Sequence, residues 1–300
     1  MVRIAAFPKC YLDALVVQRS MTVFDWIGIA AQLPHVEGTE LYPPALESLQ
    51  PAYLGRVRSA LDDAGLEAPM MCASPDFTQA DAAARSEQVA TMRSVITAVA
   101  QLGGSTCRVL SGQRRPDVAR ADGIRWAVDA ITSLLPHAES HGITLVIENH
   151  YKDGYWTHPE FAQDRGTFLE IVSAIDSPWF GVNYDPSNAL VAGDDPLELL
   201  EDVIDRVVTM HASDRHFEGG TIEDLRRFDA DPVAGYAPML RHGVIGEGLI
   251  DYDGVFAILA KHSFDGWISI EDGDDPAAGP EHLRRSAEFL HARLVAHGLA

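Results

Sequence analysis

Short runs of apolar and β-branched residues recur along the whole chain, and a longer segment separates each run from the next. The runs lie at residues 2–7, 35–41, 68–73, 106–110, 143–147, 181–184, 207–211 and 267–270. Between them, apolar residues recur at spacings of three and four, which is typical of helices that pack one face on a sheet. The clearest example is 86–102, and the segments 124–135 and 282–294 repeat it. The pattern therefore predicts eight strand–helix units.

Eight such units without a long linker predict an α/β fold, a closed parallel (β/α)8 TIM barrel in which residues 1–300 form a single domain. An open doubly wound sheet is the alternative, and it usually carries a glycine-rich turn after its first strand. This chain has FPKCYLD at that position, which contains no glycine. The closed barrel is therefore the favoured fold.

Two connections are longer than the others. One spans residues 151–163, after the fifth predicted strand, and the other spans 215–249, after the seventh. The second includes a short helical piece at 222–228. Loops that follow the strands of such a barrel form its catalytic face. We therefore expect both enlarged loops to border a bound substrate.

Composition excludes several classes of partner. The chain has 47% hydrophobic and 22% charged residues, as a packed domain does, and a formal net charge of −21. A surface with this much negative charge repels phosphate backbones. We therefore expect no nucleic-acid partner. We expect no membrane partner either, because the chain lacks an apolar stretch of about 18 residues. An export signal is not evident, and the odd number of cysteines fits a reducing compartment, so a cytoplasmic location is expected.

Four successive strands each end in a side chain that can bind a metal ion. The fifth run leads to Glu148, the sixth to Asp185, the seventh to His211 and the eighth to Glu271. Taken alone, each would be read as a helix cap, a solvated loop residue or a hydrogen-bonded core histidine. One shared cation explains all four, because the carboxyl ends of barrel strands meet at one rim. Three carboxylates and an imidazole favour Mn²⁺ first, with Mg²⁺, Co²⁺ or Zn²⁺ as alternatives.

The same segments carry a family resemblance. The motifs are LVIENH (145–150), VNYDPSN (182–188), VTMHASD (208–214), GEGLIDY (246–252) and WISIED (267–272), with EGTELYPP (37–44) near the second strand. On these motifs the chain resembles the sugar phosphate isomerase/epimerase superfamily of xylose isomerase-like barrels. That superfamily includes ketose 3-epimerases, hydroxypyruvate isomerases and inosose dehydratases.

The resemblance implies an enzyme with one divalent metal ion. Glu148, Asp185, His211 and Glu271 correspond to its ligands, and Glu148 and Glu271 would also be the acid/base pair beside the substrate. The implied reaction is isomerisation or epimerisation of a sugar or related keto-polyol. A metal-bound carbonyl acidifies the adjacent C–H bond and stabilises the enediolate that forms when a carboxylate removes the proton.

The chain departs from the family pattern at two positions. Asn188 stands where the epimerases have a histidine three residues after the metal-binding aspartate, and an amide cannot titrate. Phe217 stands where the family has a substrate-binding arginine, so Arg215 is the candidate replacement. We therefore expect Asn188 and Arg215 to bind the substrate. We also expect that substrate to differ from a free pentose.

Five further residues are candidates for contact with the substrate. His150 either orients Glu148 or acts as a general base. Lys9 and Glu40, near the ends of the first two strands, are candidates for hydrogen bonds to substrate hydroxyls. Trp156 in the first enlarged loop offers a stacking surface for a sugar ring. Asp214 is expected to orient His211 or Arg215 beside the substrate.

A lyase on the same scaffold is the alternative function. Removing a proton beside a leaving group expels water, as in inosose dehydratases, or an aglycone, as in C-glycoside-cleaving enzymes, and His150 would be the base. The resemblance implies a small-molecule sugar or sugar-derived substrate and a homo-oligomer. It implies a small partner subunit if the chain cleaves C-glycosides. An abasic-site endonuclease shares the fold but needs several more histidines and basic loops, which a net charge of −21 opposes. A non-catalytic sugar-binding role is the last alternative.

Overall fold

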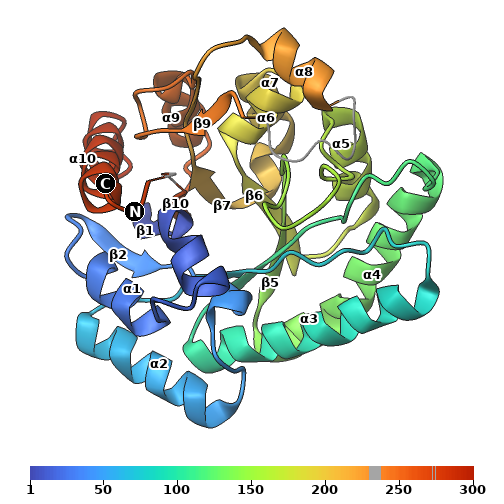
Figure 1. Cartoon of the computed structure of the whole chain (residues 1–300), viewed down its shortest axis with the longest axis horizontal. Helices are drawn as coiled ribbons and strands as arrows, with labels where there is room; N and C mark the ends of the chain where they lie inside the picture. The colour runs from blue at the N-terminus through green and yellow to red at the C-terminus, as the bar shows by residue number, and fades with distance from the viewer. Residues whose placement is uncertain (230–237, 272, 274) are drawn as a thin grey trace.

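Eight parallel strands form a barrel in the computed structural model, and helices surround it (Figure 1). The structure describes residues 1–229, 238–271, 273 and 275–300. Within these residues the barrel strands are β1 (Arg3–Ala6), β2 (Val36–Thr39), β3 (Met70–Cys72), β4 (Thr106–Val109), β5 (Thr144–Glu148), β6 (Phe180–Tyr184), β7 (Val207–Ala212) and β10 (Trp267–Ile270). Each strand overlaps one of the predicted runs. The predicted TIM barrel is therefore confirmed.

The strands pair in the order β2-β1-β10-β7-β6-β5-β4-β3. Two bridges, Gly38 with Glu67 and Leu41 with Met71, join the two ends of this sheet. The backbone N–H of Cys72 donates to the carbonyl of Leu41 at 2.8 Å across the same seam. The sheet is thus nearly closed, and the carboxyl ends of β5, β6, β7 and β10 lie on one continuous arc of the rim.

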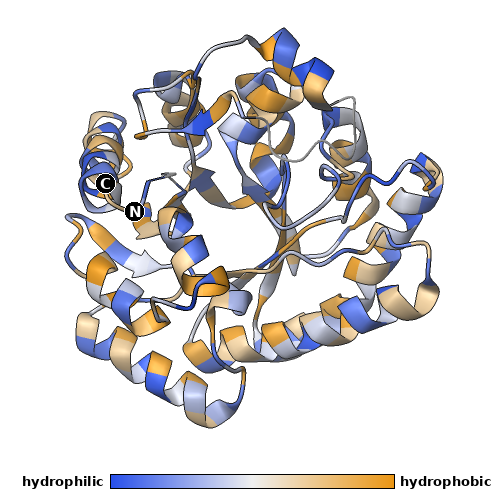
Figure 2. Cartoon of the chain, viewed as in Figure 1, coloured by the Kyte–Doolittle hydropathy of each residue, from blue (hydrophilic) through white to orange (hydrophobic). Residues whose placement is uncertain are grey.

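Helices cover the outside of the barrel. They are α1 (Val23–Ala30), α2 (Pro51–Ala64), α3 (Ala82–Leu102), α4 (Arg120–His141), α5 (Arg165–Ala174), α6 (Pro186–Ala192), α7 (Pro196–Val203), α8 (Ile222–Asp229), α9 (Tyr252–Lys261) and α10 (Gly279–Ala296). Figure 2 shows apolar and polar residues alternating along them. In α3 the predicted apolar stripe, including Met92, Ile96 and Val99, is buried against the sheet.

The loops after the strands build up the rim. After β1 the chain forms a 3₁₀ turn (Lys9–Tyr11) and a π-helical turn (Asp13–Val17), neither of which the sequence pattern predicted. After β7, β8 (Arg215–Phe217) pairs antiparallel with β9 (Leu240–His242), with α8 between them in sequence. Residues 230–237 of this predicted loop lie outside the described residues, as does Asp272 of the WISIED motif.

The two ends of the chain meet at the barrel. The backbone N–H of Val2, just before β1, donates to the carbonyl of Leu299 at 2.9 Å, and the termini lie together in Figure 1. The last helix, α10, thereby packs beside the first strand. Among the described residues, no helix is both long and apolar enough to cross a lipid bilayer.

Candidate active site

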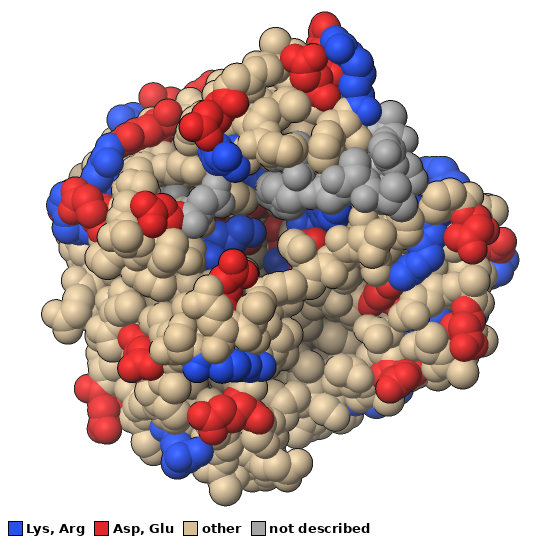
Figure 3. Space-filling view, viewed as in Figure 1, with Lys and Arg blue, Asp and Glu red and all other residues tan. Residues whose placement is uncertain are grey.

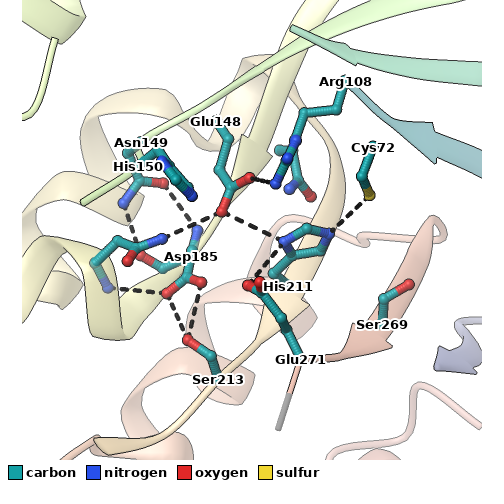
Figure 4. Close-up of polar contacts among 12 residues, drawn as sticks. Cys72, Arg108, Glu148, Asn149, His150, Asp185, His211, Ser213, Ser269 and Glu271 are labelled. Atoms are coloured by element: carbon teal, nitrogen blue, oxygen red, sulfur yellow. Dashed lines mark hydrogen bonds and ion pairs between the residues drawn. The ribbon is translucent and has the colours of Figure 1, made fainter. Parts of the chain in front are cut away.

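Four acidic and imidazole side chains from four strands meet at the rim of the barrel (Figure 4). Glu148 is the last residue of β5, Asp185 directly follows β6, His211 lies in β7 and Glu271 directly follows β10. Each offers a ligand atom, and these atoms all lie within 4.8 Å of one another. All four side chains are buried. We call them the four-residue cluster, and it contains the residues that the sequence predicted as metal ligands.

His211 faces the carboxylates of this cluster with one ring nitrogen. Its Nδ1 lies 3.3 Å from Glu148 Oε1 and 3.3 Å from Glu271 Oε2. Among the described residues, this buried nitrogen has no hydrogen-bond partner. Burial opposes the charged imidazolium, but the carboxylates of Glu40 and Glu148 outweigh it and raise the pKa of His211 well above its usual value.

The donor set of the cluster fits a divalent cation. Burial, together with Glu271 and Glu148, raises the pKa of Asp185 to about 6, so a cation placed among these carboxylates would stabilise their charged forms. Three carboxylates and an imidazole whose Nδ1 points at them are ligands for a hard or borderline metal ion. Glu148, Asp185, His211 and Glu271 would hold this ion.

Asp185 is fixed by hydrogen bonds from several directions. It caps the N-terminus of α6, because its Oδ1 accepts from the backbone N–H of Asn188 at 2.9 Å. Ser213 Oγ donates to the same carboxylate at 2.8 Å. The side-chain amide of Asn149 bonds the backbone of Asp185 in both directions, at 2.6 and 2.8 Å. The position of Asp185 is therefore set before any ligand arrives.

Glu148 is held by a cation that sequence reasoning missed. Arg108, in β4, donates from Nη1 to Glu148 Oε2 at 2.6 Å, and both side chains are buried. Burial alone would raise the pKa of Glu148, but His211 and Arg108 lower it to about 2. The only signal in the sequence was an arginine inside the otherwise buried run TCRV, which is unusual for a barrel strand.

Glu271 is paired in a similar way. Lys9, in the turn after β1, donates from Nζ to Glu271 Oε1 at 2.9 Å. Burial works against the ionised carboxylate, but Lys9 and His211 hold the pKa of Glu271 well below its usual value. The two glutamates of the cluster therefore each have one oxygen bound by a basic side chain and the other near His211 Nδ1.

A cavity of about 400 Å³ opens above the cluster. Lys9, Arg108, His150 and Glu271 line it, and an apolar wall is formed by Phe7, Leu12, Tyr42, Tyr155 and Pro276. Figure 3 shows the hollow at the centre of this face, with basic and acidic side chains inside it. A cavity of this size suits a small organic ligand.

His150 lines this cavity, and the carboxyl group of Glu160 lies near its ring. Its Nδ1 lies 3.9 Å from Glu160 Oε2, and neither atom has a hydrogen-bond partner among the described residues. Burial raises the pKa of Glu160 to about 8 and lowers that of His150 to about 4. At neutral pH the imidazole is therefore neutral and the carboxyl group is largely protonated. Glu160 was not among the residues the sequence singled out.

Asp214 contacts Arg215, one of the two residues it is expected to orient, through the backbone. Its carboxylate accepts hydrogen bonds from five backbone amides, at distances of 2.9 to 3.2 Å. The donors are Arg215, Gly246, Gly248, Leu249 and Ile250. A Cβ at Gly248 would lie 2.2 Å from Asp214 Oδ1, so only glycine allows this approach. Asp214 therefore organises the end of the second enlarged loop, away from His211 and the cavity lining.

Asn188 and Arg215 lie behind the cluster and not on the cavity lining. Asn188 Nδ2 donates to Glu148 Oε1 at 3.1 Å, and its Oδ1 accepts from Arg215 Nη2 at 2.8 Å. Both are buried: Asn188 supports Glu148 directly, and Arg215 supports Asn188. Trp156 is also absent from the lining, where the neighbouring Tyr155 is found. Glu40 is buried against His211, with Nε2 of the ring 2.9 Å from its Oε2, so it is not exposed to the cavity.

Comparison with known proteins assigns the family. The model of the xylose isomerase-like TIM barrel family matches residues 28–293. An inosose dehydratase of Geobacillus kaustophilus is 30% identical over 212 residues, which cover 67% of this chain and 64% of that protein. An inosose dehydratase of Bacillus thuringiensis is 25% identical over 174 residues, which cover 55% of this chain and 53% of that protein. The chain thus spans between half and two thirds of these relatives.

Solved structures agree on the fold across nearly the whole chain. A D-tagatose 3-epimerase-like protein superposes with a TM-score of 0.74 at 18% identity, covering 99% of this chain and 98% of the other. The probable 3-DHS dehydratase AsbF from Bacillus anthracis superposes with a TM-score of 0.73 at 17% identity, covering 97% of this chain and 99% of the other. The IOLI protein, whose structure holds a zinc atom, gives 0.70 at 14% identity, covering 99% and 98%. The chain belongs to the xylose isomerase-like TIM barrel family.

Proposed function

We propose that this protein is a divalent-metal-dependent lyase that removes water from a sugar-derived ketone or keto-polyol, with His150 as the base. The observation that carries the proposal is the pairing of Glu148 with Arg108 and of Glu271 with Lys9. A carboxylate held by a cation is a weak base. His150 is neutral, lines the cavity and is thus the better proton acceptor beside the cluster.

Each residue then has a defined part. A divalent cation in the four-residue cluster would polarise the carbonyl of a bound ketone and make the adjacent C–H bond more acidic. His150 takes the proton from that carbon, and the electron pair forms the new C=C bond as the C–O bond at the next carbon breaks. The hydroxyl leaves with a proton as water, and Lys9 Nζ, on the cavity wall, is positioned to donate to it. The inosose dehydratases among the relatives support this choice of reaction.

Isomerisation or epimerisation of a sugar is the second candidate. The observation in its favour is that Glu148 and Glu271 each lie 3.3 Å from His211 Nδ1, so two carboxylates flank one metal position. In that mechanism one glutamate removes the proton and the other returns it. Neighbours such as the D-tagatose 3-epimerase-like protein share the fold, which is compatible with this chemistry.

One experiment separates the two reactions. The protein, loaded with Mn²⁺, is incubated in D₂O with an inosose, D-tagatose, D-psicose or L-ribulose, and products are followed by NMR and ultraviolet absorption. Elimination gives a conjugated ketone that absorbs in the ultraviolet, whereas epimerisation gives a saturated product with deuterium at the inverted carbon. Deuterium exchange without any conjugated product would reject the lyase in favour of the epimerase.

Two variants in the same loop test the base. His150→Gln is expected to lower kcat by about 10²–10⁴-fold, the usual contribution of a general base, and to leave metal binding unchanged. His158→Gln is the matched control, since His158 is half-buried and does not line the cavity. Equal activity of His150→Gln and His158→Gln would assign the base elsewhere.

The metal, the location and the assembly belong to the same proposal. We expect Mn²⁺ as the resident ion, because three carboxylates dominate the donor set. The cysteines Cys10, Cys72 and Cys107 are buried and form no disulfide with one another, which supports a reducing, cytoplasmic setting. A homo-oligomer remains a prediction, as does a small partner subunit for a substrate that loses an aglycone instead of water.

A further inference from the structure

A second carboxylate lies behind the imidazole of the four-residue cluster. Glu40 follows β2, on the opposite side of His211 from Glu148 and Glu271. Its Oε2 lies 2.9 Å from His211 Nε2. Both side chains are buried, and neither is part of the cavity lining. Glu40 therefore reaches the cluster only through the histidine ring.

Two further donors fix the carboxylate of Glu40. Ser269, in β10, donates from Oγ to Glu40 Oε1. Cys72, at the end of β3, donates from Sγ to Glu40 Oε2 at 2.9 Å. Both donors are fully buried. Since strands β2, β3 and β10 all contribute, the position of Glu40 is determined by the barrel itself and not by a loop.

This arrangement selects one form of the histidine. A carboxylate accepts hydrogen bonds, so the ring nitrogen that contacts Glu40 must carry the hydrogen. Nε2 is then the donor, and Nδ1 is the nitrogen whose lone pair becomes available when a cation displaces its proton. That lone pair points toward Glu148 Oε1 and Glu271 Oε2, where the cation would sit. The centre of the Phe7 ring lies 6.2 Å from the centre of the His211 ring, and the planes of the two rings differ by 29°.

We propose that Glu40, held by Ser269 and Cys72, is the positioning residue of the metal centre: it fixes the Nε2–H form of His211 and sets how tightly the cation is bound. The inference rests on the metal site of the proposed function and not on the choice between lyase and epimerase. A carboxylate that accepts from a metal-binding imidazole orients the ring and increases its basicity. Loss of such a partner typically costs 10–100-fold in metal affinity.

The test measures metal binding directly. Zn²⁺ and Mn²⁺ are titrated into metal-free protein by competition with a chromophoric chelator and by calorimetry. Glu40→Gln keeps the shape of the side chain but removes its charge, and it is expected to weaken binding by about 10–100-fold. Glu37→Gln is the matched control, because Glu37 lies in β2, three residues before Glu40, but is exposed and pairs with Arg3. Its affinity is expected to equal that of the unaltered protein.

A spectroscopic measurement on the unaltered protein does not depend on whether Glu40→Gln folds. In NMR spectra of protein with ¹⁵N-labelled histidine and bound Zn²⁺, the nitrogen resonances of His211 are expected to show a proton on Nε2 and the metal on Nδ1. A proton on Nδ1 would overturn the inference. Ser269→Ala is expected to weaken binding in the same direction as Glu40→Gln but less, because one of the donors to Glu40 is lost.

The outcomes separate this inference from the proposed function. If the unaltered protein binds neither Zn²⁺ nor Mn²⁺, the metal-dependent function itself fails. If the unaltered protein binds these ions, and folded Glu40→Gln binds them with an affinity within about twofold of that of the unaltered protein, then only the positioning role fails. Weakened binding in Glu40→Gln with unchanged binding in Glu37→Gln supports it.

Discussion

Replacing Glu160 with glutamine should remove a pH dependence from the stability of the fold. Glu160 is buried, and its Oε1 accepts from the backbone N–H of Ser111 at 2.8 Å and from the Ser111 hydroxyl. Glutamine has the same shape and can accept both hydrogen bonds through its carbonyl oxygen. The substitution therefore changes the ability to ionise and leaves the packing nearly unchanged.

The size of the effect follows from the pKa. Burial raises the pKa of Glu160 from its ordinary value of 4.5 to about 8. Folding therefore favours the protonated carboxyl group, and its contribution to stability is complete below the unfolded pKa and lost as pH rises toward about 8. One pKa unit corresponds to about 1.4 kcal/mol, so the total loss is on the order of 5 kcal/mol. Between about pH 5.5 and 7.5 it amounts to roughly 2–3 kcal/mol.

The assay is urea unfolding of both proteins at several pH values in this window, with metal removed from each. Other titrating groups, such as Asp185, are present in both, so the difference between the two free energies of unfolding isolates Glu160. We expect the free energy of unfolding of the glutamine variant to increase steadily, relative to that of the unaltered protein, as pH rises. Parallel stability curves across the window would refute the reasoning, because Glu160 would then ionise as easily in the folded protein as in the unfolded one.

Three further perturbations test the framework of the site. Arg108→Met leaves Glu148 charged and buried without its partner, so urea unfolding at neutral pH should show a loss of about 3–5 kcal/mol, and a loss below about 1 kcal/mol would contradict the buried ion pair. Adding Mn²⁺ to chelator-treated protein at about 100 times its Kd should stabilise it by about 2.7 kcal/mol in thermal unfolding, and Asp185→Asn should lose most of that response. Asp214→Ala removes the acceptor of five backbone amides, so it should cost more than about 2 kcal/mol and speed proteolytic cleavage within residues 215–250, whereas unchanged cleavage would show that the loop is held by other contacts.

The barrel could be predicted from sequence because each strand is a short apolar run followed by an amphipathic helix, and this pattern depends only on local burial. The four-residue cluster was also accessible to sequence reasoning. Polar side chains at the carboxyl ends of four successive buried strands must share one rim once the barrel is assumed. The structure brings Glu148, Asp185, His211 and Glu271 together as that reasoning requires.

The surroundings of the cluster were less accessible, because they depend on contacts between residues far apart in the chain. Arg108 meets Glu148 across a separation of 40 residues, and Glu40 meets His211 across 171. No spacing rule links such pairs, so Glu40 was assigned to the substrate and Arg108 was overlooked. Proximity in sequence suggests His211 or Arg215 as the partner of Asp214; its carboxylate does bind the backbone amide of Arg215, but its other four donors come from residues 246–250.

The hydrogen bonds of Asp214 make the second enlarged loop an exchangeable module. Asp214 directly follows the Asp185-binding Ser213, and it binds both the residue that starts β8 and the stretch that leads into α9. Entry and exit of the loop are therefore fastened at a single point next to the four-residue cluster. Changes of sequence between these fastenings should therefore leave the geometry of the four-residue cluster unaltered. Among the described residues of this loop, His242 lines the cavity, so directed evolution of new substrate preferences should begin there.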